Sequence, residues 1–184
     1  MPAGDAVPRA EPRPASLQTS PRLMYEDGFA RLPELTIAWP TVPRHHADEC
    51  PLLLLFDLLT DGKDAPLQKL LVDERKLTAN VGASAYHSQL AGEMYLTVRA
   101  FDGINLDAVE SALGEGFRRF EAAGVDPAAL ARAKTTEEVA FYSGLGSVLG
   151  KGRQLARYDV IAGRPDFTEV ELMRAKLAFD EAIP

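Results

Sequence analysis

The chain has 184 residues, of which 46% are hydrophobic and 26% are charged, and it carries a net charge of −7. This composition is ordinary for a globular domain, whereas the acidic balance excludes the basic face that nucleic-acid binding needs. No apolar run is long enough to span a membrane, and a single cysteine, Cys50, excludes an internal disulfide. We therefore expect a soluble, cytoplasmic or periplasmic protein with no nucleic-acid partner and no membrane insertion.

The first 22 residues differ from the rest because they contain five of the chain's 13 prolines. Proline fixes the backbone angle φ and removes an amide donor, which favours an extended, poorly packed chain. The segment also lacks the apolar region of a signal peptide. We predict that residues 1–21 are an interdomain linker of a longer polypeptide, or a disordered tail, and that residues 22–184 form one domain.

Alternating side chains predict the β-strands. Residues 35–39 alternate between large apolar and other side chains, which is typical of a half-buried strand. Two further runs, 79–85 and 94–100, alternate in the same way and are joined by a short connection, so they predict an antiparallel hairpin. We interpret residues 22–27 as an additional strand.

Helical periodicity and end signals predict a series of helices. Asn105 and Gly124 bound the clearest one, because Asn caps helix starts and Gly ends helices. Thr168 and Glu171 have the spacing of a capping box for a last helix. The predicted helices begin at or just after Asp48, Asp64, Asn105, Asp126, Ser147 and Thr168. Strands followed by consecutive helices predict an α+β fold, in which helices pack on one face of an antiparallel sheet.

The apolar faces of these elements predict the core. Residues 52–59 are apolar on nearly every side, so their helix is expected to be deeply buried. The side chains that we expect to find buried are Leu53, Leu54, Phe56, Val98, Leu113 and Phe117.

The order of motifs along residues 38–86 resembles a known family. It is similar to the C-terminal-type, non-catalytic domain of the pitrilysin/insulinase family of zinc metallopeptidases, including the subunits of mitochondrial processing peptidase. The matching positions are Trp39, Pro43, His46, Asp48, Gly62, Leu67, Leu71, Val72, Glu74, Leu77 and Thr78. Weaker matches follow at Gly124 to Pro127, Leu130, Ala133, Lys134, Leu155, Ala156 and Tyr158. The resemblance covers residues 22–184 and implies the α+β fold of these domains.

The active half of that family binds zinc through an H-x-x-E-H helix, which this chain lacks. The nearest sequence is H-x-x-E-C at residues 46–50, and a thiolate is a legitimate zinc ligand. However, this stretch lies before or at the start of the helix, and Pro51 disturbs regular geometry there. The alternative interpretation is that His45 and His46 are loop residues and that Cys50 is a small buried side chain.

Two other candidates for chemistry are weak. His87 stands near the end of a strand, where a histidine is usually a surface or turn residue. The glycine-rich residues 144–152 suggest a phosphate loop, but their spacing differs from G-x-x-x-x-G-K-[ST], and a glycine replaces the Ser or Thr that binds magnesium.

An Arg–Tyr pair seven residues apart, which some non-catalytic halves contribute, is absent from residues 70–80. We therefore assign no catalytic, cofactor-binding or metal-binding residue in this chain.

The resemblance implies a function that belongs to a larger protein. We expect a non-catalytic domain of a zinc metallopeptidase, which packs on a zinc-bearing domain or subunit and helps to enclose and bind a peptide substrate. The zinc would lie in that other half, and this chain alone would be inactive. Two alternatives stay open, a catalytically inactive scaffold subunit of the same fold and an unrelated α+β binding module. Self-association through an uncovered surface is also expected.

Overall fold

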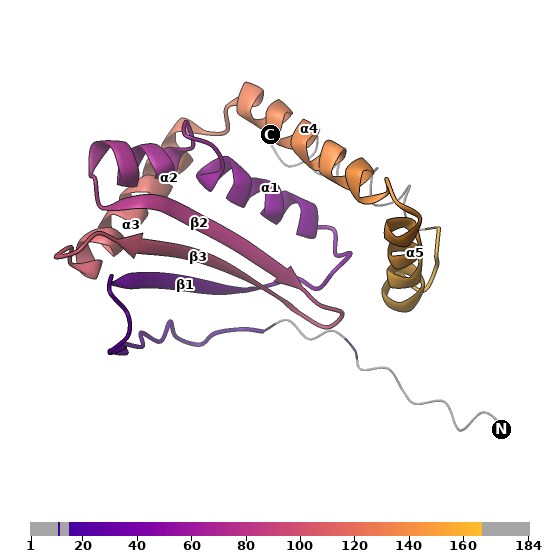
Figure 1. Cartoon of the computed structure of the whole chain (residues 1–184), viewed down its shortest axis with the longest axis horizontal. Helices are drawn as coiled ribbons and strands as arrows, with labels where there is room; N and C mark the ends of the chain where they lie inside the picture. The colour runs from indigo at the N-terminus through magenta and orange to yellow at the C-terminus, as the bar shows by residue number, and fades with distance from the viewer. Residues whose placement is uncertain (1–10, 12–14, 167–184) are drawn as a thin grey trace.

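The computed structural model describes residue 11 and residues 15–166. At its centre is an antiparallel sheet of β1 (Glu34–Thr41), β2 (Thr78–His87) and β3 (Gly92–Ala100), in the order β1-β3-β2 (Figure 1). The hairpin of β2 and β3 and the strand β1 are those that the alternating sequence predicts. Because β3 is central, β1 and β2 each leave one side of their backbone unpaired within this sheet.

Helices cover one face of the sheet. Figure 1 shows α1, α2 and α3 on that face, with α4 and α5 farther out beyond α1. The bounds are α1 Glu49–Thr60, α2 Pro66–Gln68, the π-helix η1 Lys69–Glu74, α3 Leu106–Ala123, α4 Pro127–Gly144 and α5 Val148–Ala162. The predicted α+β fold, with helices on one face of an antiparallel sheet, is confirmed. The π-helical turn that continues α2 was not predicted.

The core lies between the sheet and α1, α2, η1 and α3. Its buried side chains are Leu59, Leu67, Leu70, Leu71, Val81, Leu96, Val98, Ala100, Val109, Ala112 and Leu113. Trp39 packs edge-on against Phe56 and Phe117, with ring centroids 5.7 and 6.4 Å apart. Of the predicted core, Leu54, Val98 and Leu113 are buried, Phe56 and Phe117 are partly buried against the core, and Leu53 is partly exposed outside it.

The predicted start of one helix differs in the structure, and another predicted start agrees. Asn105 accepts a hydrogen bond from the amide of Asp107 at the start of α3, as predicted. Asp48 stands at the start of α1, but its side chain makes no capping bond; instead its amide donates to Nδ1 of His46. The predicted capping box at Thr168 and Glu171 lies outside the described residues.

The predicted strand at 22–27 is wrong, because the structure has no strand there. Three apolar residues in a row point in different directions in an extended chain, so they form no single face that a sheet could bury. Leu23 is accordingly 92% exposed. The side chain of Asp27 accepts a bond from the amide of Phe29 and turns the chain just before β1. Arg22 pairs with Asp107 and Glu110 and joins this segment to α3.

Candidate functional site

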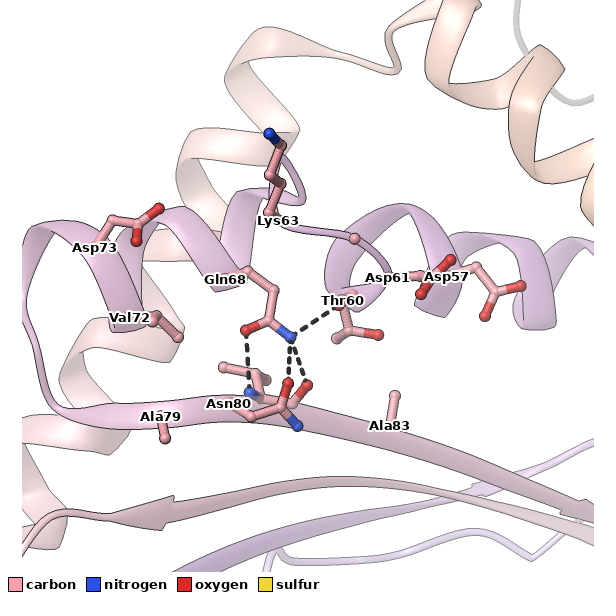
Figure 2. Close-up of a pocket in the computed structure, with 12 residues that line it drawn as sticks. Asp57, Thr60, Asp61, Lys63, Gln68, Val72, Asp73, Ala79, Asn80 and Ala83 are labelled. Atoms are coloured by element: carbon pink, nitrogen blue, oxygen red, sulfur yellow. Dashed lines mark hydrogen bonds between the residues drawn. The ribbon is translucent and has the colours of Figure 1, made fainter.

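The unpaired side of β2 is partly closed by a glutamine side chain. Oε1 of Gln68 accepts a hydrogen bond from the amide of Val81 (3.2 Å), and Nε2 donates to the carbonyl of Val81 (2.9 Å) (Figure 2). Nε2 also reaches the carbonyl of Thr60, at 3.0 Å. The Gln68 amide therefore takes the place that a neighbouring strand would have at Val81.

An arginine closes the other end of the same strand. Nε of Arg44 donates to the carbonyl of His87 at 3.0 Å, and the amide of Arg44 donates to the carbonyl of Ser88 at 2.9 Å. Arg44 belongs to the loop between β1 and α1, which is hydrogen-bonded to the end of β2. A carboxylate oxygen of Glu49 lies 3.9 Å from the guanidinium and helps to hold it.

A short stretch of open backbone remains between these two side chains. In an antiparallel strand the amide and carbonyl of one residue point to the same side, and this side alternates along the chain. Since the amide and carbonyl of Val81 point away from the sheet, those of Ala83 and Ala85 do so too. No hydrogen bond from the described part of the chain outside the sheet reaches either residue. We call Ala83–Ala85 the edge window; its small side chains leave the backbone accessible.

A cleft of about 530 Å³ opens beside the edge window, between β2, the end of α1 and η1. Figure 2 shows Asp57, Asp61 and Lys63 around its upper rim, with Ala83 below them. Burial raises the pKa of Asp57 to about 6, and the nearby carboxylates of Glu137 and Asp61 add to this effect. The cleft is therefore polar and holds a half-buried carboxyl group with a pKa of about 6.

The H-x-x-E-C segment has a structural role. The buried carboxylate of Glu49 accepts a hydrogen bond from the amide of His45 at 2.5 Å, so it is held against the loop. The ring of His46 faces Asp48 on the exposed side. The segment thus does not gather its side chains around a common point. Within the part of the chain that the structure describes, no group of three or more His, Cys, Asp or Glu residues could hold a metal ion.

The expectation that His87 is a surface or turn residue is wrong. The side chain is only 8% exposed, at the end of β2, and its Nδ1 lies 2.9 Å from the carbonyl of Val42. Gly92 allows this approach, because a Cβ atom there would overlap Val42 and His87. His87 therefore joins β2 to the chain that leaves β1.

Residues 144–152 form the junction of α4 and α5. Ser147 caps α5 by accepting a hydrogen bond from the amide of Gly150 at 2.9 Å. Gly150 lies so close to the carbonyl of Gly144 that no side chain fits. The segment follows a helix and not a strand, so it lacks the setting of a phosphate loop.

Residues 3–137 match the family described as the peptidase M16 inactive domain, and the chain belongs to this family. This match confirms the resemblance to non-catalytic domains of pitrilysin/insulinase-type metallopeptidases. No curated protein matches the chain. None of the helices in the described residues is long and apolar enough to pass through a membrane.

Solved structures have the same fold. A protease from Helicobacter pylori superimposes with a TM-score of 0.69 at 17% identity, over 84% of this chain and 39% of its own. The inactive peptidase domain of a candidate zinc protease from Bordetella parapertussis has a TM-score of 0.66 at 16% identity, over 84% and 82%. A candidate zinc protease from Bordetella pertussis Tohama I has 0.67 at 18%, over 78% and 79%. This chain thus spans well under half of the Helicobacter protein.

The residues that define the edge window carry no recognisable signal in the sequence. Gln68 and Arg44 are ordinary polar residues in the sequence, and neither belongs to a motif. The alternation of small residues in 79–85 indicated a strand, but it did not say that the strand lies at an edge.

Proposed function

We propose that the chain is the non-catalytic domain of a zinc metallopeptidase. It packs against a zinc-bearing domain or subunit and helps to enclose and bind an extended peptide substrate. The edge window carries this proposal, because it offers the outward amides and carbonyls of Ala83 and Ala85 to a partner backbone. An extended peptide pairs with such an edge as an added strand, and its main chain supplies the hydrogen bonds.

The closure of β2 at both ends favours pairing with a short peptide over pairing with a long strand of another sheet. Gln68 and Arg44 occupy the backbone at Val81 and His87, so a long strand would have to displace both side chains. This arrangement protects the edge from pairing along its full length, which is the route by which open edges aggregate. A peptide in the edge window finds unpaired backbone groups only between Val81 and His87.

Exposed apolar side chains support a partner domain. Leu23, Met24 and Phe29 are 85–96% exposed on the segment before β1, and Val148 and Leu149 are exposed at the start of α5. Clustered apolar side chains of this kind mark surfaces that meet another protein. A zinc-bearing half is the partner that the family membership favours. Alone, this chain is expected to hold no stoichiometric zinc and to cleave no peptide.

The test is peptide binding by an edge-blocked variant. Ala83→Pro removes one outward amide of the edge window, and proline is tolerated where the amide of an edge strand faces solvent. Fluorescence anisotropy measures the binding of a labelled, extended peptide to the full chain. We expect this binding to weaken about tenfold or more, because the peptide loses a hydrogen bond and is obstructed by the proline ring.

Ala38→Pro is the matched control, because it makes the same change on β1. Pro40 already stands in that strand with its backbone nitrogen facing outward, because proline has no amide hydrogen to give to the sheet. Ala38 lies two residues away, so its amide also faces outward. This variant should bind the peptide as the unchanged chain does. Equal binding by Ala83→Pro and the unchanged chain would contradict the proposal.

A further inference from the structure

An aromatic and acidic group lies at the end of the hairpin, on the face of the sheet that the helices leave uncovered. Tyr86 is 61% exposed, and its ring packs against that of Tyr95 with centroids 6.1 Å apart at 71°. Glu93 stands directly across from Tyr86 in the register of β2 and β3. The interaction with the Glu93 carboxylate raises the pKa of Tyr95, so this carboxylate lies close to the rings.

This group is adjacent to the edge window. Side chains alternate between the two faces of a strand, so Ser84 and Tyr86 both point to the uncovered face. A peptide that pairs with Ala83 and Ala85 lies about 4.8 Å from β2. Its side chains that point to the same face then lie beside Ser84 or Tyr86. Glu93 is the next side chain across the sheet from Tyr86.

The charges around this group favour a cation. Two basic side chains on or near the strands, Arg99 and Arg44, are already engaged. Arg99 lies on the same face as Glu93, but it pairs with Glu34 at 2.7 Å and stands six residues along β3, roughly 20 Å away. Arg44 bonds the carbonyl of His87. Glu93 therefore has no basic partner in the described residues.

We propose that Tyr86, Tyr95 and Glu93 form a subsite for a lysine or arginine side chain of the peptide in the edge window. A cation gains from the face of an aromatic ring and from a nearby carboxylate, whereas a neutral side chain gains only the ring contact and an acidic one is repelled. This inference rests on the proposed function, and it adds a preference for basic residues to it.

The test compares peptides that differ at one position. The probe is a fluorescein-labelled, extended five-residue peptide with a central arginine, and its twins carry citrulline or glutamate there. Citrulline has nearly the shape of arginine without its charge. The full chain should bind the arginine peptide about threefold to tenfold more tightly than the citrulline peptide, the size expected of an exposed cation–π contact with a surface ion pair. The glutamate peptide should bind most weakly.

Two variants separate the contribution of the Glu93 charge from that of the Tyr86 ring. Glu93→Gln and Tyr86→Leu should each bring the arginine-to-citrulline ratio close to one. Glu34→Gln makes the same charge change on the same face at the far end of the sheet, and it should leave the ratio unchanged. Circular dichroism shows whether each variant is folded. Since Glu93 is exposed, Glu93→Gln alone carries the test if Tyr86→Leu does not fold.

Three outcomes decide the question. A ratio that falls in Glu93→Gln but not in Glu34→Gln supports the subsite. Equal binding of the arginine and citrulline peptides by the unchanged chain overturns the subsite and leaves the edge window intact. Failure of every peptide to bind overturns the edge window and the subsite together.

Discussion

The half-buried carboxyl group of Asp57 illustrates what one residue does in this fold. The cleft beside β2 and the carboxylates of Glu137 and Asp61 raise its pKa from 3.8 to about 6. Well below pH 4 the group is protonated in both the folded and the unfolded chain, so its ionisation does not affect stability. As the pH rises toward 6 and above, the unfolded chain ionises freely while the folded chain must charge a half-buried group. The ionisation of Asp57 therefore lowers the free energy of unfolding as the pH rises.

We predict that Asp57→Asn becomes more stable relative to the unchanged chain as the pH increases from 4 to 7. Asparagine keeps the size of the side chain but does not ionise. The free energy of unfolding, measured with urea at several pH values, gives the difference between the two proteins. Asp102→Asn, in the turn before α3, controls for the loss of one carboxylate. A difference that stays constant across this range would show that Asp57 is not held in a shielded cleft.

At the scale of the elements, helix α3 is joined to the rest of the molecule by a buried apolar side. Leu113 is 1% exposed and belongs to the core cluster, while Gly116, one turn later, meets the side chain of Leu67. The helix therefore packs closely on the α2–η1 segment, and its apolar side has little room to rearrange.

We predict that Leu113→Ala lowers the free energy of unfolding by about 2–5 kcal/mol, since the truncated side chain leaves a cavity in a tightly packed region. Leu90→Ala, at the exposed tip of the hairpin, makes the same chemical change and should alter stability by less than about 1 kcal/mol. Denaturant unfolding of both variants checks this. Similar losses in both would mean that the core is placed wrongly.

The π-helix η1 shows how an element can escape sequence analysis. The periodicity of residues 67–71 predicts a helix, and the structure has one there. The wider turn appears in the hydrogen bond from the amide of Arg75 to the carbonyl of Leu70, five residues back. Side-chain periodicity over one turn cannot distinguish this from an α-helix.

At the scale of the whole molecule, the boundary of the domain stays a prediction. We predict that residues 1–21 form a linker or tail and that residues 22–184 form a single domain. The ion pairs of Arg22 with Asp107 and Glu110 support a boundary at this point, because they join the chain to α3.

We predict that brief treatment with a low concentration of protease removes the N-terminal segment and leaves a stable product that begins near Arg22. The packed sheet and helices resist cleavage because their backbone must unfold before it enters a protease. Mass spectrometry of the product identifies the cut. First cuts within residues 50–120 would contradict a single folded domain.

The sequence by itself determined the local elements and the family. Each local signal, such as the alternation in 35–39 and 94–100 or the helix starts at Asn105, Asp126 and Ser147, is contained in a few neighbouring residues. It can therefore be recognised without knowledge of the fold. These signals predicted β1, the hairpin and the starts of α3, α4 and α5. The order of motifs pointed to the non-catalytic metallopeptidase domain for the same reason.

Only the tertiary structure decided where the candidate site lies. The closure of β2 depends on contacts between residues that are distant in the chain, namely Gln68 with Val81 and Arg44 with His87. The burial of His87 and the failure of residues 22–27 to form a strand likewise depend on what lies nearby in space. A sequence pattern records which face of a segment is apolar, but the partner of that face is chosen when the whole chain packs.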